Sequence, residues 1–285
     1  MKKLNLYFSI SNSQKESHTD FLKNVSSRFN LINIFDSIDQ EKLVTEELLL
    51  LGGDGSLNYL VNKLGKKLLN KLKIIYIPTG TANDFSRSLN LSKPHFNYEF
   101  ISEIINRNTY IQIPIIRFND KKFINVATAG LPATVTDSDE GIIKEQTGVF
   151  SYYLSALSKL FSETFYNIEI ESDNENFKVK TNGFIISQGL YAGGGIKVTP
   201  NYIANFGEEF SLLINKKKDI VNTVSSAIKI QKETNNFEDE NIEVINTKSV
   251  TIRSSDLIPY KLDGEEVFTK EAKIYKENFF NIAIY

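Results

Sequence analysis

The segment LLLLGGDGSLNYLVNKL, residues 48–64, places an unbroken leucine run directly before two glycines, an aspartate and a helix-like pattern. The leucine run is too short for a buried helix and leads straight into glycines, so it predicts a central strand of a parallel sheet. A helix is expected from about Leu57 to Asn70. The glycines let a ligand approach the backbone, and free N–H groups at a helix start favour an anion such as phosphate.

The first third of the chain alternates strands and helices. Strands are predicted at 4–10, 31–35, 48–51 and 73–77, and helices at 14–29 and after the glycine turn. This alternation predicts a parallel sheet with helices on both faces. Ligands bind such open sheets at the carboxyl ends of the strands.

Asp54 sets this turn apart from the phosphate loop that carries a lysine, because no Lys-Ser or Lys-Thr pair stands at the required place. A carboxylate repels a phosphate unless Mg²⁺ lies between them or the carboxylate accepts a proton from an attacking hydroxyl. The alternative is a glycine-rich turn in which Asp54 caps the helix. Because Asp54 is expected on a loop, Asp54→Ala is predicted to abolish activity and leave the fold intact.

A second glycine turn follows the next strand, in IIYIPTGTANDFSRSLNL, residues 74–91. The strand ends at Pro78 and Gly80, and a helix is expected from Thr81. Thr81 and Asp84 have the spacing of a capping box, which is the structural alternative to a binding role. Two adjacent strands that both end in glycine turns predict two helix N-termini at one edge of the sheet.

From about Tyr110 the pattern becomes β-rich. Asn119-Asp120 predicts a hairpin. Helices are expected at 148–165 and near 220–232, and strands in NIEIES, FKVKTNGFIISQG, EFSLLINK, SVTIRSS, YKLDGEEVF, EAKIYKE and FFNIAIY. The predicted fold class is α/β, with an open parallel α/β domain at 1–109 followed by a mostly antiparallel β-sandwich domain at 110–285.

Composition excludes several classes of protein. The net charge of −2 provides no overall basic field for nucleic acid. The absence of cysteine removes disulfides and thiolate metal sites and fits a reducing compartment. No apolar run approaches the roughly 20 residues of a membrane-spanning helix, so any membrane contact is expected to be peripheral. The start, MKKLNLYFSI, is interpreted as a strand rather than a signal peptide.

The two glycine turns, GGDGS and PTGTANDFSRSL, together resemble the catalytic domain of diacylglycerol kinases and related lipid kinases, and most of all the bacterial YegS-like soluble lipid kinases. FINVATAG (123–130), YAGGGIKVTPNYIANFG (191–207) and LDGEE (262–266) stand in the family's order at comparable separations. The resemblance covers nearly the whole chain. NAD kinases and 6-phosphofructokinases share the glycine-aspartate motif, so its combination with the other motifs makes the resemblance specific.

The resemblance implies a two-domain kinase that binds ATP and Mg²⁺ and phosphorylates a lipid hydroxyl, diacylglycerol or phosphatidylglycerol-like. Residues 1–109 would bind the nucleotide and residues 110–285 the lipid acceptor. Catalytic roles are implied for Asp54, Asp263 and Glu265, with Asp54 and Asp263 beside the metal and either Glu265 or Asp54 as proton acceptor. Nucleotide contacts are implied for Gly52, Gly53, Gly55, Ser56, Asn58, Gly80, Thr81, Asn83 and Asp84.

The residues of LDGEE also allow two structural interpretations. Two carboxylates two positions apart on an extended segment would share a face, which favours a joint role for Asp263 and Glu265. Asp-Gly is equally a common hairpin turn, and in isolation that interpretation is preferred.

Several departures from the family bear on activity. SISNSQKES stands in place of an Asn-Pro-x-Ser-Gly loop, and Tyr59 stands where a glutamate is frequent. Phe206 occupies the place of a structural metal aspartate, so no tightly bound metal is expected at 203–208. A catalytically weak nucleotide- or lipid-binding homologue is therefore the alternative hypothesis. A kinase for a soluble substrate such as NAD is disfavoured by PTGTANDF and LDGEE.

The expected partner is a lipid substrate at a membrane surface, with a cytoplasmic location at the inner membrane surface, no nucleic acid and a possible homodimer. Small residues in NVATAGLPATV and ISQGLYAGGG are expected to leave room for acyl chains in a cleft between the domains, unless they only allow tight sheet packing. A bulky residue at Gly130 or Gly194 is predicted to impair lipid phosphorylation more than ATP binding. Lys63, Lys66 and Lys67 are candidates for contact with anionic headgroups, although a solvated face is favoured.

Overall fold

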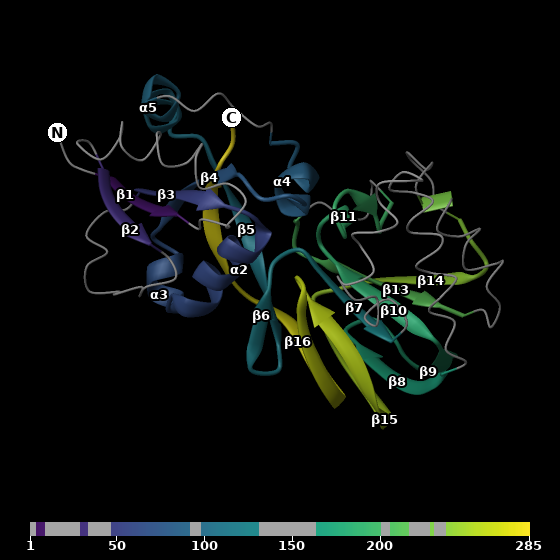
Figure 1. Cartoon of the computed structure of the whole chain (residues 1–285). Coiled ribbons are helices and arrows are strands. Elements are labelled where there is room, and N and C mark those ends of the chain that lie inside the picture. Colours follow the sequence, from purple (N-terminus) through teal and green to yellow (C-terminus); the bar gives the residue numbers. More distant parts are fainter. Residues whose placement is uncertain are drawn as a thin grey trace. The chain divides into compact units, whose positions relative to one another are not determined.

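The structure is a computed structural model that describes residues 4–8, 29–33, 47–91, 98–130, 164–200, 206–216, 229–230 and 238–285. These ranges leave out most of the helices expected at 14–29, 148–165 and near 220–232, and all of the segment SISNSQKES. Residue 29 is described as strand, and residues 164 and 165 are not helical. The chain divides into two compact units. The first unit comprises Met1–Ile115 with Glu277–Tyr285, and the second comprises Ile116–Lys276 (Figure 1).

The first unit is built on a parallel sheet with the strand order β16-β4-β3-β1-β2. Its strands are β1 (Leu4–Phe8), β2 (Phe29–Asn33), β3 (Glu47–Gly52), β4 (Lys73–Pro78) and the last residues of β16 (Glu265–Ala283). Gly52 pairs with Pro78 at the carboxyl ends of β3 and β4, so both glycine turns leave the sheet at the same edge. The prediction of a parallel α/β unit is confirmed.

Helices cover both faces of this sheet. On one face, α5 (Tyr98–Arg107) packs Ile101 and Ile104 against alternate residues of β3 and β4. The intervening residues of these strands are equally buried, as the two-residue period of a strand requires. The opposite face carries α2 (Asp54–Lys63) and α3 (Lys66–Leu69), and Phe85 of α4 (Asp84–Ser88) packs edge-on against Tyr76 (Figure 1).

The helix after the first glycine turn differs from its predicted bounds. It begins at Asp54 rather than Leu57, and it ends at Lys63 instead of continuing to Asn70. Leu64 and Gly65 have extended backbone angles, and the four-residue α3 follows them. Glycine is a weak helix former, and the break at Leu64 and Gly65 lets the buried Leu64 and Leu69 both pack inward.

The C-terminal strand crosses from the second unit back to the first. Residues 281 and 282 of β16 pair in parallel with β4, and Phe280 and Ile282 are fully buried. The division between the units falls within β5 (Tyr110–Phe118), after Ile115. The predicted domains, 1–109 and 110–285, therefore differ from the observed units chiefly because FFNIAIY completes the parallel sheet.

The second unit is antiparallel, with the strand order β14-β13-β10-β7-β15-β16. Its further strands are β6 (Lys121–Phe123), β7 (Val126–Gly130), β8 (Tyr166–Ser172), β9 (Asn176–Thr181), β10 (Gly183–Ser187), β11 (Tyr191–Ala192), β12 (Ile196–Lys197), β13 (Phe210–Asn215), β14 (Ile242–Thr247) and β15 (Ser249–Leu262). The predicted β5–β6 hairpin is confirmed, with Asn119 at a positive φ of 51° in its turn.

β15 links two sets of strands around the core of this unit. Residues 250–254 pair with β8, whereas residues 260–262 pair with β7. SVTIRSS and YKLDGEEVF were predicted as separate strands, but SVTIRSS and the residues YKL both belong to β15, which is irregular between Arg253 and Ile258. The rest of YKLDGEEVF forms the turn and the start of β16. Phe184, Phe210 and Tyr260 are among the large side chains fully buried in this core.

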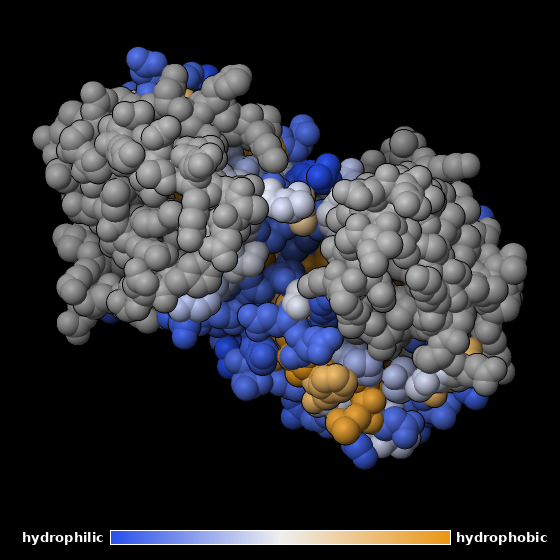
Figure 2. Space-filling model, viewed as in Figure 1, coloured by the Kyte–Doolittle hydropathy of each residue, from blue (hydrophilic) through white to orange (hydrophobic). Residues whose placement is uncertain are grey.

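Among the described helices, none is long and apolar enough to cross a membrane. Leu257 of β15 and Phe268 of β16 are large apolar side chains that are 58% and 60% exposed. Figure 2 shows an apolar patch in the lower part of the view, where β15 and β16 lie in Figure 1.

Candidate active site

The two glycine turns of the first unit touch each other. A Cβ atom on Gly80 would lie 2.7 Å from Cα of Gly53 and 2.9 Å from Oδ1 of Asn83. Thr79 also donates its N–H to the carbonyl of Gly52 at 3.0 Å. Only residues without side chains allow this approach, so the predicted meeting of the two turns at one sheet edge is confirmed.

Asp54 connects the two helices that begin at these turns. Its Oδ2 accepts a hydrogen bond of 2.6 Å from the N–H of Asp84, and its Oδ1 accepts one of 3.3 Å from the N–H of Phe85. These N–H groups belong to the first turn of α4. Asp54 therefore caps α4 from α2, where its negative charge also meets the positive end of the α4 dipole.

The structure of these two turns corrects two predictions. Asp54 is not on a loop but is the first residue of α2, so the reason for expecting an intact fold in Asp54→Ala is wrong. The capping box of Thr81 and Asp84 does not form, because the cap residue of α4 is Asn83, in the left-handed region with φ 50°. Thr81 is exposed, while Asp84 is buried in the first turn of α4.

The environment of Asp54 raises its pKa to about 6. Burial is the main cause, and the neighbouring charge of Asp84 adds to it, whereas the hydrogen bonds from Asp84, Phe85 and Tyr76 oppose the shift. Asp54 is therefore ionised at neutral pH but close to its titration range. A carboxylate in this state can bind a cation or accept a proton.

Tyr76 is a site residue that the sequence did not indicate. This fully buried residue of β4 places its hydroxyl 3.4 Å from Oδ1 of Asp54. Burial, together with the charge of Asp54, raises the Tyr76 pKa well above its ordinary value, so the phenol stays neutral and donates. Tyr285, the last residue, donates to the Tyr76 carbonyl at 2.7 Å. Tyrosine in a buried strand is ordinarily a core residue, so KIIYI carried no functional signal.

Asn83 has an acceptor that faces the turns. Its Nδ2 donates to the carbonyl of Gly80 at 2.5 Å. Its Oδ1 is buried and accepts no hydrogen bond from any residue that the structure describes. An unsatisfied buried oxygen is costly, and a ligand hydroxyl or a cation would satisfy it.

The other predicted nucleotide residues also lie at this edge. Gly55 is exposed in the first turn of α2, and its Cβ position is open. Ser56 and Asn58 are buried on the inner side of α2. The first unit thus gathers Gly52, Gly53, Asp54, Gly55, Ser56, Asn58, Gly80, Thr81, Asn83 and Asp84 around one pair of turns. Their binding roles remain predictions.

Asp263 lies in the second unit, at the tip of the hairpin between β15 and β16. Asp263 and Gly264 have positive φ values of 45° and 101° between the paired residues Leu262 and Glu265, as in a two-residue hairpin turn of type I′. The Asp263 carboxylate accepts hydrogen bonds from the N–H groups of Ile124, at 2.7 Å, Val126, at 2.9 Å, and Asn125. Asp263 therefore binds the turn to the start of β7.

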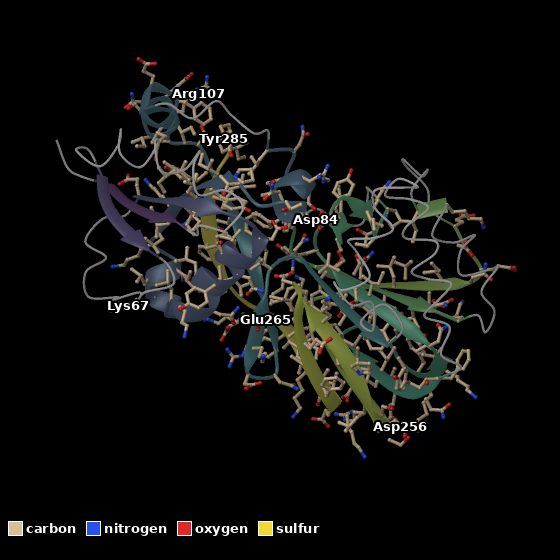
Figure 3. All side chains as sticks on the ribbon, viewed as in Figure 1. Lys67, Asp84, Arg107, Asp256, Glu265 and Tyr285 are labelled. Carbon is tan, nitrogen blue, oxygen red and sulfur yellow. The ribbon has the colours of Figure 1, made fainter. Side chains whose placement is uncertain are left out.

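Glu265 has different surroundings. Its side chain is 62% exposed, and Oε2 lies 3.6 Å from Nζ of Lys121 (Figure 3). The expectation that Asp263 and Glu265 share a face is wrong, because Asp263 is a turn residue with positive φ rather than part of an extended strand. The hairpin interpretation of LDGEE is confirmed.

The donor set fits Mg²⁺ only in part. Asp54 and Asn83 supply oxygen atoms, which Mg²⁺ prefers. No group of three or more His, Cys, Asp or Glu side chains gathers around a common point in the described ranges. That is compatible with a magnesium ion held by one or two carboxylates together with phosphates and water. Asp54 and Asp263 both accept hydrogen bonds on both carboxylate oxygens, Asp54 from Asp84, Phe85 and Tyr76 and Asp263 from the N–H groups of residues 124–126. A metal ion at either carboxylate would share its oxygens with these donors.

The glycines expected beside acyl chains differ from each other. Gly130 has a φ of 68°, and a Cβ there would lie 2.5 Å from the carbonyl oxygen of Asn182. Tight sheet packing therefore explains Gly130, and a bulky residue at this position would disturb the fold. Gly194 lies between β11 and β12, in a run of three glycines with positive φ.

The chain matches two family models. The diacylglycerol kinase catalytic domain matches residues 3–117, and the YegS C-terminal NAD kinase β-sandwich-like domain matches residues 125–274. A protein of Shewanella frigidimarina, named as a YegS-like lipid kinase, is 29% identical over 249 residues, which are 84% of this chain and 78% of that protein. The diacylglycerol kinase of Staphylococcus carnosus is 28% identical over 220 residues, 77% of this chain and 70% of that one.

Solved structures share the fold. A diacylglycerol kinase from Bacillus anthracis superposes with a TM-score of 0.71 at 19% identity, over 99% of this chain and 97% of that chain. An NAD kinase from Archaeoglobus fulgidus, in complex with ATP, superposes with a TM-score of 0.53 at 15% identity, over 98% and 93%. The β-rich second unit is accordingly a β-sandwich of the YegS type. The chain therefore belongs to the family of lipid kinases that join a diacylglycerol kinase catalytic domain to a YegS C-terminal domain.

Proposed function

We propose that this chain transfers the γ-phosphoryl group of ATP to a hydroxyl group of a lipid, diacylglycerol or phosphatidylglycerol-like, in a Mg²⁺-dependent reaction. The observation that carries the proposal is the arrangement at the two glycine turns. Gly53 and Gly80 are in backbone contact, and the carboxylate of Asp54 lies between the first turns of α2 and α4. The names of the relatives support a lipid as the acceptor.

The start of α2 would hold phosphate. No side chain in the described part of the chain caps this ten-residue helix, and Gly53 and Gly55 leave its N-terminal backbone accessible. A helix N-terminus of this kind attracts phosphate through its N–H groups and its dipole. The ATP bound to the structurally similar NAD kinase agrees with a nucleotide in this fold.

Asp54 and Asn83 would hold the magnesium ion, with phosphate oxygens completing its ligands. The ion, when bound, neutralises charge on the transferred phosphoryl group. Without a cation, Asp54 and Asp84 would repel the triphosphate. The raised pKa of Asp54 still leaves it ionised at neutral pH, as a metal ligand must be.

Glu265 would act as the proton acceptor. The lipid hydroxyl oxygen bonds to the γ-phosphorus, the bond to the β-phosphate oxygen breaks, and the hydroxyl proton passes to a carboxylate. Glu265 is exposed enough to meet a substrate, whereas both oxygens of Asp263 already accept N–H bonds. Asp263 would accordingly position the hairpin that carries Glu265.

Peripheral contact with the lipid surface would come from a lysine face on α2, α3 and the turn that follows α3. Lys63, Lys66, Lys67 and Lys71 are exposed, and Asp84 is the only acidic residue between positions 55 and 98. Each lysine near an anionic bilayer contributes about 1 kcal/mol of binding free energy.

The decisive experiment measures ATP consumption with diacylglycerol, phosphatidylglycerol, ceramide and long-chain bases in mixed micelles, with and without Mg²⁺. Phosphorylation of at least one lipid, dependent on Mg²⁺, is expected. Nucleotide binding without turnover on any lipid would contradict the proposal and favour a catalytically weak binding protein.

A further inference from the structure

A lysine side chain holds the turn that precedes β13. Lys276 of β16 donates hydrogen bonds from Nζ to the carbonyl oxygens of Gly207 and Glu209, the latter at 2.8 Å. Two carbonyls of one short turn therefore converge on a single positive charge. The Lys276 side chain is partly buried, and all of these residues belong to the second unit.

Phe206 gives this turn an unusual backbone. Its φ of 54° lies in the left-handed region, which glycine, asparagine and aspartate adopt more readily than an aromatic residue. Its side chain is buried, with a relative exposure of 7%. The turn thus keeps a conformation suited to aspartate although it has no carboxylate at this position.

Carbonyl oxygens at such a turn are ordinary ligands of a divalent cation, but that ion also needs a carboxylate or further oxygens. A lysine ammonium is a compact point charge with three donors, and it meets the same carbonyls without other ligands. Burial lowers the pKa of Lys276 to about 8, while Glu209 and Glu208 raise it and Lys248 lowers it. Lys276 consequently remains mostly protonated at pH 7.

We propose that the ammonium group of Lys276 is the built-in cation of turn 206–209 and takes the place of a bound metal ion there. The residues of this turn agree with the proposal, because the Phe206 side chain has no oxygen atom with which to bind a metal ion. This inference concerns the second unit and does not depend on the proposed function.

The turn is also linked to the hairpin of Asp263. Phe206 donates its N–H to the carbonyl of Gln188 at 3.3 Å, and Gln188 donates from Nε2 to the carbonyl of Ile124 at 2.7 Å. The N–H of Ile124 in turn meets the Asp263 carboxylate. Lys276 is therefore a positioning residue for the Asp263 hairpin. It acts through turn 206–209 and does not contact the substrate.

Amide hydrogen exchange tests the positioning role. Lys276→Met should increase exchange at Phe206, Gln188 and Ile124 at least tenfold relative to the wild type. Lys248→Met is the matched control, because Lys248 pairs with Glu208 of the same turn at an exposed site, 2.7 Å away, and should leave these amides unchanged. Equal exchange in the two variants would overturn the proposal. If the chain phosphorylates a lipid, Lys276→Met should lower kcat and leave the KM for ATP unchanged.

A metal-rescue variant tests the substitution of an ammonium for a metal ion. Phe206→Asp combined with Lys276→Met should acquire a Ca²⁺- or Mg²⁺-dependent rise of several degrees in Tm, measured without nucleotide. The wild type should show no such rise. A cation-dependent rise in the wild type, or none in the double variant, would overturn the proposal. This experiment stays informative if Lys276→Met alone does not fold, since metal-dependent folding of the double variant then decides.

Discussion

Asp54, the first residue of α2, accepts a hydrogen bond of 2.6 Å from the N–H of Asp84, the first residue of α4. The carboxylate proposed to bind a metal thus also supports the second helix of the site. Its burial raises its pKa to about 6, so the charge needed for chemistry is held at a cost to stability.

Two substitutions of Asp54 separate its proposed role in metal binding from its role in capping α4. Asp54→Asn should abolish ATP turnover but keep or raise Tm. Its amide oxygen still accepts the short bond from Asp84, and the removal of a buried charge offsets the loss of the longer bond from Phe85. Asp54→Ala should lower the free energy of unfolding by about 1–2 kcal/mol, because it leaves the N–H groups of Asp84 and Phe85 without their acceptor. Turnover assays and thermal melting check both variants. An Asn variant that melts below the Ala variant would contradict this account.

The pH dependence of stability should carry the signature of Asp54. Its pKa is about 6 in the folded chain and 3.8 without perturbation, so the folded state binds the proton more tightly. The stabilisation from this proton is fully present below pH 3.8 and is lost as the pH rises through 6. Any stability advantage of Asp54→Asn over the wild type should therefore shrink as the pH falls from 7 to 4. Chemical denaturation at several pH values measures the difference in the free energy of unfolding between Asp54→Asn and the wild type. A difference that stays constant with pH would exclude the assigned pKa.

The proposed kinase activity should fall at acidic pH, because Asp54 becomes protonated there. If ionised Asp54 holds the metal, kcat should decline below about pH 6 as the carboxylate takes up a proton. A pH–rate profile at saturating Mg²⁺ gives the apparent pKa. Full activity at pH 5 would mean that the ionised form is not required.

The contact between the glycine turns should make Gly80 sensitive to substitution by alanine, whereas Gly55 should tolerate it. Gly80→Ala places a methyl group 2.7 Å from Cα of Gly53, so the turns must separate and Tm should fall. Gly55→Ala is the control, because its Cβ position is open and alanine favours the helix by about 0.5–1 kcal/mol. Thermal melting compares them, and a Gly80→Ala variant as stable as Gly55→Ala would rule out the close contact.

A proton-accepting role for Glu265 distinguishes it from its neighbour Glu266. Both side chains are exposed on β16. Glu265→Gln should lower kcat by a factor of about 10²–10⁴, as expected for loss of a general base, with little change in the KM for ATP. Glu266→Gln should retain activity. Similar kinetics for the two variants would assign proton transfer to another carboxylate.

Whether the lysine face binds lipid surfaces can be tested by charge reversal. Lys67→Glu with Lys71→Glu should weaken binding to phosphatidylglycerol-containing vesicles by more than tenfold, and binding to phosphatidylcholine vesicles should stay weak throughout. The matched control reverses Lys178 and Lys180, which are exposed on β9 of the second unit. Vesicle sedimentation at low salt is the measurement. Equal losses in both double variants would indicate a net-charge effect rather than a defined face.

Much of the architecture could be predicted from local pattern. The leucine run before GGDGS, the β-rich texture after Tyr110 and the Asn119-Asp120 turn all depend on neighbours in the sequence. Glycine, proline and the period of apolar residues act over a few positions, and therefore they indicate strands, turns and the edge where the two glycine turns meet. The family resemblance rests on the same short motifs.

Only the tertiary structure decided what the functional side chains contact. Asp54 meets α4 rather than capping its own helix, Asp263 meets the backbone of 124–126, and Lys276 meets the carbonyls of residues 207 and 209. The return of β16 to β4 likewise pairs residues 281 and 282 with residues 73 and 74. Such partners are far apart in sequence, and the choice among them depends on which buried polar groups can be satisfied at once when the whole chain packs. Local pattern carries no information about that competition.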